Sequence, residues 1–124
     1  MSFDKGISNI KEIAGSDGIH AVEAIQDLHP DIHKYVVQFG FGEIYSRREL
    51  DRKQQEMITI TSLITLGDTA NQLRFHFKAA LNVGITPQEI IGIVIHCIPY
   101  VGFPRVLNAL QIAKEVIDDV DEEK

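Results

Sequence analysis

The sequence of 124 residues contains no tryptophan, a single cysteine and no excess of positive charge. Because Cys97 is alone, no disulfide bond can form within the chain, which is typical of proteins from a reducing compartment. Lysine and arginine total 12 against 18 aspartates and glutamates, and the formal net charge is −6. Nucleic-acid-binding proteins usually carry a basic patch, so the composition argues against a nucleic-acid partner.

Long hydrophobic runs are also missing. The longest candidate, residues 90–100, is far shorter than the roughly 20 residues of a membrane-spanning helix, and it contains His96. The N-terminal residues lack the uninterrupted apolar core of a signal peptide. We therefore expect a soluble, cytoplasmic protein without a membrane partner.

The residues that are present favour a folded chain. Hydrophobic residues make up 44% and charged residues 24%, which argues against disorder. The length fits one domain and allows a sizeable core. We expect a single domain over residues 1–124, with its core over about 28–117 and a solvated acidic tail over 118–124.

Apolar residues recur at helical spacing through most of the chain. This spacing predicts helices over about residues 7–13, 19–28, 30–39, 52–66, 70–83, 87–98 and 103–117. In the third helix, the residues expected to face inward are Ile32, Tyr35, Val36 and Phe39. In the last helix they are Val106, Leu107, Leu110, Ala113 and Val116. The predicted fold class is all-α, a compact bundle of antiparallel helical hairpins.

The segment 72–105 holds two of these helices and the turn that joins them. Gly84 is expected to end the first helix, while Thr86 and Glu89 form a capping box at the start of the second. The second helix is apolar nearly all round, so we expect it to be buried by the fold or by a partner chain.

Three side chains in these helices are candidates for acid–base chemistry. Counting roughly 1.5 Å per helical residue, Glu56, His76 and His96 lie at similar heights, about 12 to 16 Å from the turns that join their helices. A carboxylate and two imidazoles around one pocket suit proton transfer near neutral pH. Alternatively, Glu56 is a solvated surface residue and His76 is a hydrogen-bonded core histidine.

The remaining polar candidates are arginines and one thiol. The arginines could bind substrate carboxylates, or they could be ordinary surface residues; they are Arg47, Arg48, Arg52, Arg74 and Arg105. Cys97 follows His96 directly, and sequence neighbours on a helix point about 100° apart, so the two are not spaced as a nucleophile and its base. A buried, inert thiol is the favoured interpretation. The sequence contains no metal-ligand motif.

Several short motifs occur in an order that resembles the carboxymuconolactone decarboxylase family, over roughly residues 28–116. They are Phe41-Gly42-Glu43-Ile44-Tyr45-Ser46-Arg47, Leu50-Asp51, Leu73-Arg74-x-His76-x3-Ala80-Leu81-Asn82-x-Gly84-Ile85-Thr86-x2-Glu89-Ile90 and His96-x3-Tyr100-x-Gly102-x-Pro104. The resemblance implies an alkylhydroperoxidase-like helical fold and a homo-oligomer, a trimer or hexamer. It also implies no metal, no organic cofactor, and decarboxylation of 4-carboxymuconolactone in aromatic catabolism.

The resemblance also implies residue roles. His76 and His96 would act as proton donor and oxyanion stabiliser, and Glu56 would orient a histidine. Two arginines, Arg47 and Arg74, would bind carboxylate, and the motif residue Tyr100 is assigned to substrate binding.

The chain departs from the family pattern in two places. The Cys-x-x-Cys pair of the alkylhydroperoxidase-like branch is replaced by Thr69 and Gln72, which disfavours two-cysteine peroxidase chemistry. Gln55 and Arg48 stand where the decarboxylases usually have an arginine and a proline, which weakens the case for the same substrate. The alternatives are a peroxiredoxin-like activity through Cys97 and a non-catalytic oligomeric binding protein.

Overall fold

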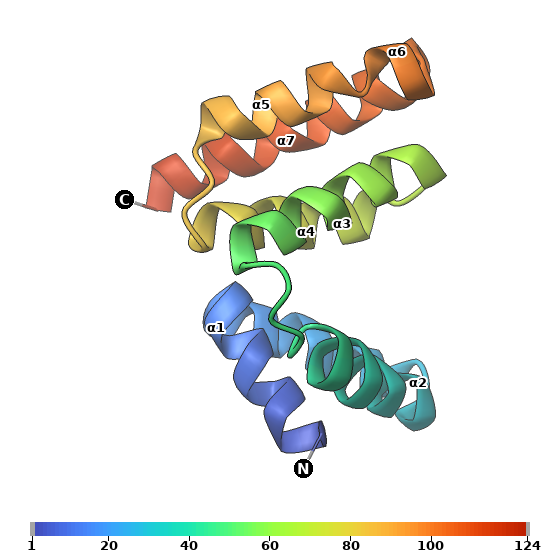
Figure 1. Ribbon diagram of the computed structural model, residues 1–124, viewed down its shortest axis with the longest axis vertical. Helices are drawn as coiled ribbons and strands as arrows, with labels where there is room; N and C mark the ends of the chain where they lie inside the picture. The colour runs from blue at the N-terminus through green and yellow to red at the C-terminus, as the bar shows by residue number, and fades with distance from the viewer. Residues whose placement is uncertain (1, 124) are drawn as a thin grey trace. The chain divides into compact units, whose positions relative to one another are not determined.

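A computed structural model describes residues 2–123, which are helical apart from short connections (Figure 1). The helices are α1 Ser2–Glu23, η1 Ala24–Asp27, α2 Pro30–Tyr35, η2 Val36–Ile44, α3 Arg52–Leu66, α4 Ala70–Asn82, α5 Pro87–His96, α6 Ile98–Val101 and α7 Phe103–Glu123. Since no strand occurs among the described residues, the all-α class is confirmed. The antiparallel hairpins and the oligomer stay predictions.

The chain forms two compact units, with the boundary between Arg52 and Lys53. The first unit holds α1, η1, α2 and η2, and the second holds nearly all of α3 and the helices that follow. The prediction of one domain over the whole length stays a prediction. No helix within residues 2–123 is long and apolar enough to cross a membrane.

In the first unit, α1 packs against η2 at very short range. A Cβ atom added to Gly6 would lie 2.0 Å from the Val37 carbonyl oxygen, and one added to Gly42 would lie 2.2 Å from the Ser2 carbonyl oxygen. Only glycine permits this approach of the two backbones. The helices predicted over residues 7–13 and 19–28 both lie within α1 or continue directly from it, and the break between them is a kink at Gly15, with φ of 67°.

The predicted inward face of the third helix was wrong. Ile32, Tyr35 and Phe39 are half exposed or more, whereas the buried side chains are His33, Val37 and Phe41. Apolar residues lie all round this segment, so its spacing fits two different stripes. The close contacts of Gly42 with Ser2 and of Val37 with Gly6 of α1 select the stripe that is buried. The helix also continues past Gly40 as the π-helix η2, which ends at Ile44.

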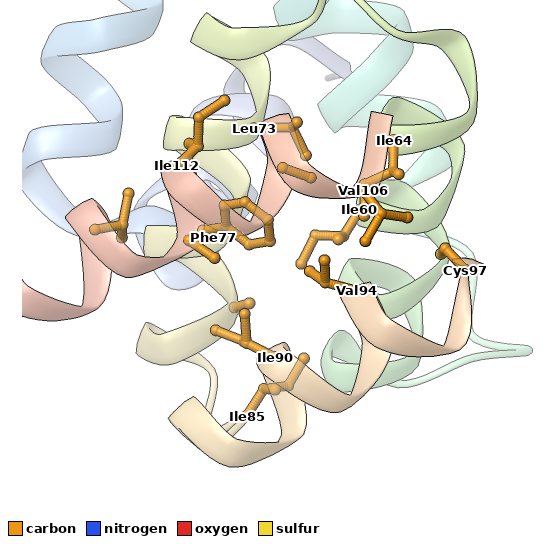
Figure 2. Packing of buried hydrophobic residues seen from close by; sticks show 14 residues of the cluster. Ile60, Ile64, Leu73, Phe77, Ile85, Ile90, Val94, Cys97, Val106 and Ile112 are labelled. Carbon is orange, nitrogen blue, oxygen red and sulfur yellow. The ribbon is translucent and has the colours of Figure 1, made fainter. Parts of the chain in front are cut away.

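The core of the second unit is built from α3, α4, α5 and α7. Figure 2 shows the ring of Phe77 in the middle of this cluster, with Ile112 on one side and Ile60 and Val94 on the other. Helix α7 packs against both α4 and α5, and Figure 1 shows α5 running beside it. These contacts fix the positions of α4 and α5, which carry the two candidate histidines.

The capping box at the start of α5 is confirmed. The Thr86 hydroxyl accepts a hydrogen bond from the Glu89 N–H at 3.1 Å, and the Thr86 N–H donates to Glu89 Oε1 at 2.9 Å. Helix α5 buries Ile90 and Val94 inside the unit but leaves Ile95 half exposed. Burial of that remaining face by a partner chain stays a prediction.

Helix α7 is longer than the sequence pattern predicted. It continues to Glu123, so the described part of the acidic tail is helical. Val120 packs against the core from this extension, and Lys78 Nζ lies 3.7 Å from Glu123 Oε1. The expected inward face was partly wrong, because Leu107 is exposed and Ala109 is buried in its place.

Candidate active site

A buried carboxylate and an imidazole meet between α3 and α4. Glu56 Oε1 lies 2.8 Å from His76 Nδ1, although the two residues are 20 positions apart in the sequence. The Glu56 side chain is 1% exposed and that of His76 is 14% exposed. The pair therefore forms a largely dry hydrogen bond, with only the imidazole reaching the surface.

A tight turn between the two helices makes this pairing possible. Gly67 and Asp68 both adopt positive φ, 72° and 55°, and the Thr69 hydroxyl donates to the Leu63 carbonyl at 2.7 Å. The glycine adopts this left-handed conformation without the steric cost of a Cβ atom. The chain thus reverses within a few residues and α4 begins close to the end of α3.

The hydrogen bond assigns the two nitrogens of His76 different roles. An ionised carboxylate only accepts hydrogen bonds, so Nδ1 carries the hydrogen that Glu56 receives. In the neutral ring Nε2 is then the free acceptor, and in the charged ring it is a donor. The edge of a neighbouring aromatic ring also contacts this imidazole, since the Phe75 and His76 centroids are 4.9 Å apart. Glu56 therefore orients the ring with Nε2 available for proton transfer.

The second oxygen of Glu56 is the less usual feature of this pair. Oε2 is buried and has no hydrogen-bond partner among the described residues. A buried acceptor left without a donor costs roughly 1–3 kcal/mol. Packing alone does not account for a carboxylate at this position, which favours a chemical role for Glu56 over the alternative of a surface residue.

The other candidate histidine lies at the end of α5, beside a cavity. His96 is exposed, and its ring centroid lies 5.9 Å from that of Tyr100. The cavity measures about 560 Å³ and is mainly apolar; its lining is Met57, Thr61, Thr65, Gly92, Ile93, His96, Cys97, Tyr100 and Val101. The hydroxyls of Thr61 and Thr65 donate to carbonyls of α3, so His96 and Tyr100 are the side chains that can donate hydrogen bonds to a ligand here.

The thiol in this cavity is poorly suited to nucleophilic chemistry. Cys97 is buried, and burial raises its pKa above the ordinary value, with a smaller opposing effect from a hydrogen bond with Thr61. Since the thiolate is the reactive form, a raised pKa lowers reactivity at neutral pH. This geometry agrees with the interpretation of Cys97 as an inert thiol and gives no support to a peroxiredoxin-like activity.

The two histidine pairs stay apart within one chain. No hydrogen bond or ring contact joins Glu56 and His76 to His96 and Tyr100 within residues 2–123. Glu56 contacts His76, whereas its neighbour Met57 lines the cavity of His96; successive helical residues point about 100° apart. The convergence of both histidines on one substrate stays a prediction.

The predicted carboxylate-binding arginines are paired with glutamates. In the first unit, Arg47 forms two hydrogen bonds with Glu49, at 2.8 and 2.9 Å, and both side chains are exposed. In the second unit, Arg74 Nη1 lies 2.5 Å from Glu115 Oε2. The assignment of both arginines to substrate binding stays a prediction.

The sequence interpretation missed a second cavity, of about 620 Å³, between the α3–α4 turn and α7. Arg74 and Arg105 both line it. The sequence does place Arg105, Asn108 and Glu115 on one face of α7 by their helical spacing. This spacing indicates a cavity only once the helix that faces them is known.

The prediction that the protein needs neither metal nor cofactor stays a prediction.

Comparison with known proteins gives a consistent set of relatives. Residues 30–115 match the model of the carboxymuconolactone decarboxylase family. A 4-carboxymuconolactone decarboxylase of Acinetobacter baylyi is 30% identical over 119 residues, which cover 95% of this chain and 88% of that protein. A nitrosuccinic acid decarboxylase of Metarhizium robertsii is 30% identical over 122 residues, covering 95% and 82%. An uncharacterised 15.0 kDa protein of Paracoccus denitrificans is 32% identical over 103 residues, covering 82% and 77%.

Proposed function

Because the chain belongs to the carboxymuconolactone decarboxylase family, we propose that it is a cofactor-independent carboxy-lyase acting on a small carboxylated substrate. The observation that carries the proposal is the buried hydrogen bond between Glu56 and His76. It presents one oriented imidazole nitrogen, Nε2, for proton transfer. Such a group supplies what a decarboxylase without a cofactor needs, a proton donor to carbon.

The names of two relatives suggest the substrate class. The departing carboxylate of carboxymuconolactone sits γ to the lactone carbonyl, across a C=C bond, and nitrosuccinic acid carries a carboxylate close to a nitro group. In both, the electron pair left by departing CO2 can be delocalised onto an electron-withdrawing group. We infer that this chain acts on an acid of that kind, with carboxylated lactones as the first candidates.

In the proposed reaction, the carbon–carbon bond to the carboxylate breaks and CO2 departs. The bonding electrons move into the lactone carbonyl or equivalent group, giving an enolate-like anion. The charged ring of His76 then donates its Nε2 proton to carbon and becomes neutral, and solvent returns the proton. Glu56 stabilises the charged ring through Nδ1–H, in the way that a buried carboxylate supports a catalytic histidine.

A hydrogen-bond donor is also needed for the developing oxyanion, and an apolar surface for the body of the substrate. We assign the first role to His96 and Tyr100, and the second to the 560 Å³ cavity that they line. Arg47 and Arg74 are retained as candidates for binding a second substrate carboxylate.

We further propose a homo-oligomer, trimer or hexamer, because apolar side chains of α5 to α7 stay exposed; they are Ile95, Tyr100, Phe103 and Leu107.

The test is release of CO2 from 4-carboxymuconolactone and from nitrosuccinate by the purified protein. Changing His76→Ala should lower kcat by about 10²- to 10⁴-fold, the usual contribution of a positioned acid or base. The control is His20→Ala, an exposed histidine at the end of α1, which should leave kcat unchanged. Equal turnover by the parent and the His76→Ala variant would show that His76 is not the proton donor.

A further inference from the structure

The second cavity contains an arginine without an acceptor. Within residues 2–123, Arg47, Arg52 and Arg74 each form an ion pair, whereas Arg48 and Arg105 have no hydrogen bond or ion pair. Of these last two, Arg105 lines a cavity, the one of about 620 Å³ between the α3–α4 turn and α7. A guanidinium with five donors and no acceptor, facing a cavity, is suited to bind an anion.

The side chain of Arg105 is exposed and passes close to the backbone of the turn. A Cβ atom built on Gly67 would lie 2.7 Å from Arg105 Nε and 3.4 Å from Cδ, so the arginine lies directly across the glycine. Any larger residue at position 67 would push it away. The glycine therefore leaves room for the guanidinium in the lining of the cavity.

The cavity has an apolar floor and a polar rim. The floor includes the buried side chains of Leu73, Ala109 and Ile112, and Asn108 lies on the rim beside Arg105. Small-molecule sites commonly combine an apolar surface with a few polar groups that fix the orientation of the ligand. The arrangement fits a ligand with an anionic head and an apolar body.

The charges around the rim limit the charge of the ligand. Four charged residues line the cavity, Arg74 and Arg105 against Asp68 and Glu115, so their net charge is 2 − 2 = 0. Arg74 is already paired with Glu115, which leaves Arg105 as the free guanidinium of the lining. One free guanidinium beside two carboxylates favours a single negative charge and disfavours phosphate or a dicarboxylate.

This cavity is separate from the Glu56–His76 pair. Arg74 and His76 are two residues apart on α4, and their side chains therefore point about 200° apart. Arg74 lies on the side that contacts α7 through Glu115, and His76 on the side that contacts α3 through Glu56. A ligand held by Arg105 does not share the oriented nitrogen of His76.

We propose that this cavity is a second binding site, for a small organic monocarboxylate whose carboxylate is held by Arg105 and whose apolar body rests on the floor of Leu73, Ala109 and Ile112. The site does not depend on the proposed function.

Equilibrium dialysis of the full chain with radiolabelled benzoate tests the site. The parent should bind benzoate, and Arg105→Gln should weaken that binding by about tenfold or more, as expected for loss of a charge-assisted pair. Arg48→Gln is the matched control, because Arg48 is also without an acceptor among the described residues but lies outside the cavity lining, and it should bind as the parent does. Benzyl alcohol, which has a similar body without the charge, should not compete.

Two further variants separate benzoate binding from misfolding and from the proposed reaction. Glu115→Gln raises the net charge of the rim by one, so it should tighten benzoate binding several-fold and admit inorganic phosphate. His76→Ala should bind benzoate like the parent, which separates this site from the proposed reaction.

Absence of benzoate binding in the parent, or equal affinity in the parent and Arg105→Gln, would overturn the proposal. So would a change in the mass of the Arg105→Gln protein in sedimentation experiments, because Arg105 would then belong to an interface between copies of the chain.

Discussion

At the scale of single residues, the environment rather than the residue type separates the candidates. Glu56 and His76 are enclosed and bonded to each other, whereas His96 is exposed beside Tyr100. Of the two candidate imidazoles, that of His76 has a carboxylate to orient it, whereas that of His96 has none among the described residues. This difference is the reason for the proposed roles, proton transfer for His76 and hydrogen bonding for His96.

The charge of Glu56, and not only its hydrogen bond, should matter for turnover. In Glu56→Gln the amide oxygen can still accept from His76 Nδ1–H, but it stabilises the charged ring less. We expect kcat for CO2 release to fall by about 10- to 100-fold with KM little changed. Glu23→Gln, at the exposed end of α1, is the control. A larger KM with the parent's kcat would assign Glu56 to substrate binding instead.

The thiol of Cys97 should react slowly and only at high pH. Burial raises its pKa above the ordinary 9.0, so at neutral pH the thiolate fraction is smaller than that of an exposed cysteine. Labelling of the folded protein by iodoacetamide should therefore keep accelerating beyond pH 9. Rapid labelling at pH 7, equal to that of the urea-unfolded chain, would contradict this and revive a peroxide-reducing role for Cys97.

At the scale of helices, close contacts decide which face is buried. The first unit depends on the approach of α1 to η2, where two glycines leave room for backbone carbonyls. In the second unit, α5 begins at its capping box and buries Ile90 and Val94. Capping is a local property of the sequence, and the choice of buried face is not.

Two neighbouring glycines of η2 should respond in opposite ways to substitution. In Gly42→Ala the new methyl group would meet the Ser2 carbonyl oxygen, whereas Gly40 has nothing within 4 Å of its added Cβ atom. We expect Gly42→Ala to lower the free energy of unfolding by about 1–3 kcal/mol. Gly40→Ala should be neutral or stabilise by up to about 1 kcal/mol, since alanine is the better helix former. Urea denaturation measures both, and similar values for the two variants would disprove the close contact.

At the scale of the whole molecule, apolar side chains on α6 and α7 stay uncovered. Tyr100, Phe103 and Leu107 are each more than half exposed. A patch of large apolar residues on a small protein commonly marks an interface. Its position beside the cavity of His96 would make assembly and activity interdependent.

Placing a charge in this patch should break the proposed oligomer. Leu107→Lys should shift the sedimenting mass from a trimer or hexamer toward smaller species, because burying an unpaired ammonium group is unfavourable. Leu28→Lys is the control, since Leu28 is 81% exposed and lies in the first unit. A parent protein that sediments as a monomer would remove the basis for the oligomer.

The sequence by itself determined the class of fold, most helix positions and the capping box, because these depend on residues within about one helical turn of each other. It also singled out Glu56, His76 and His96 as candidates and carried the family resemblance in its motifs.

Only the tertiary structure decided what each side chain faces. It selected Val37 and Phe41 over Ile32 and Phe39, joined Glu56 to His76, and directed Arg74 toward α7 beside Arg105. The physical reason is that a helix with apolar or polar residues on several sides has several acceptable faces. The choice among them depends on contacts with segments far away in the sequence.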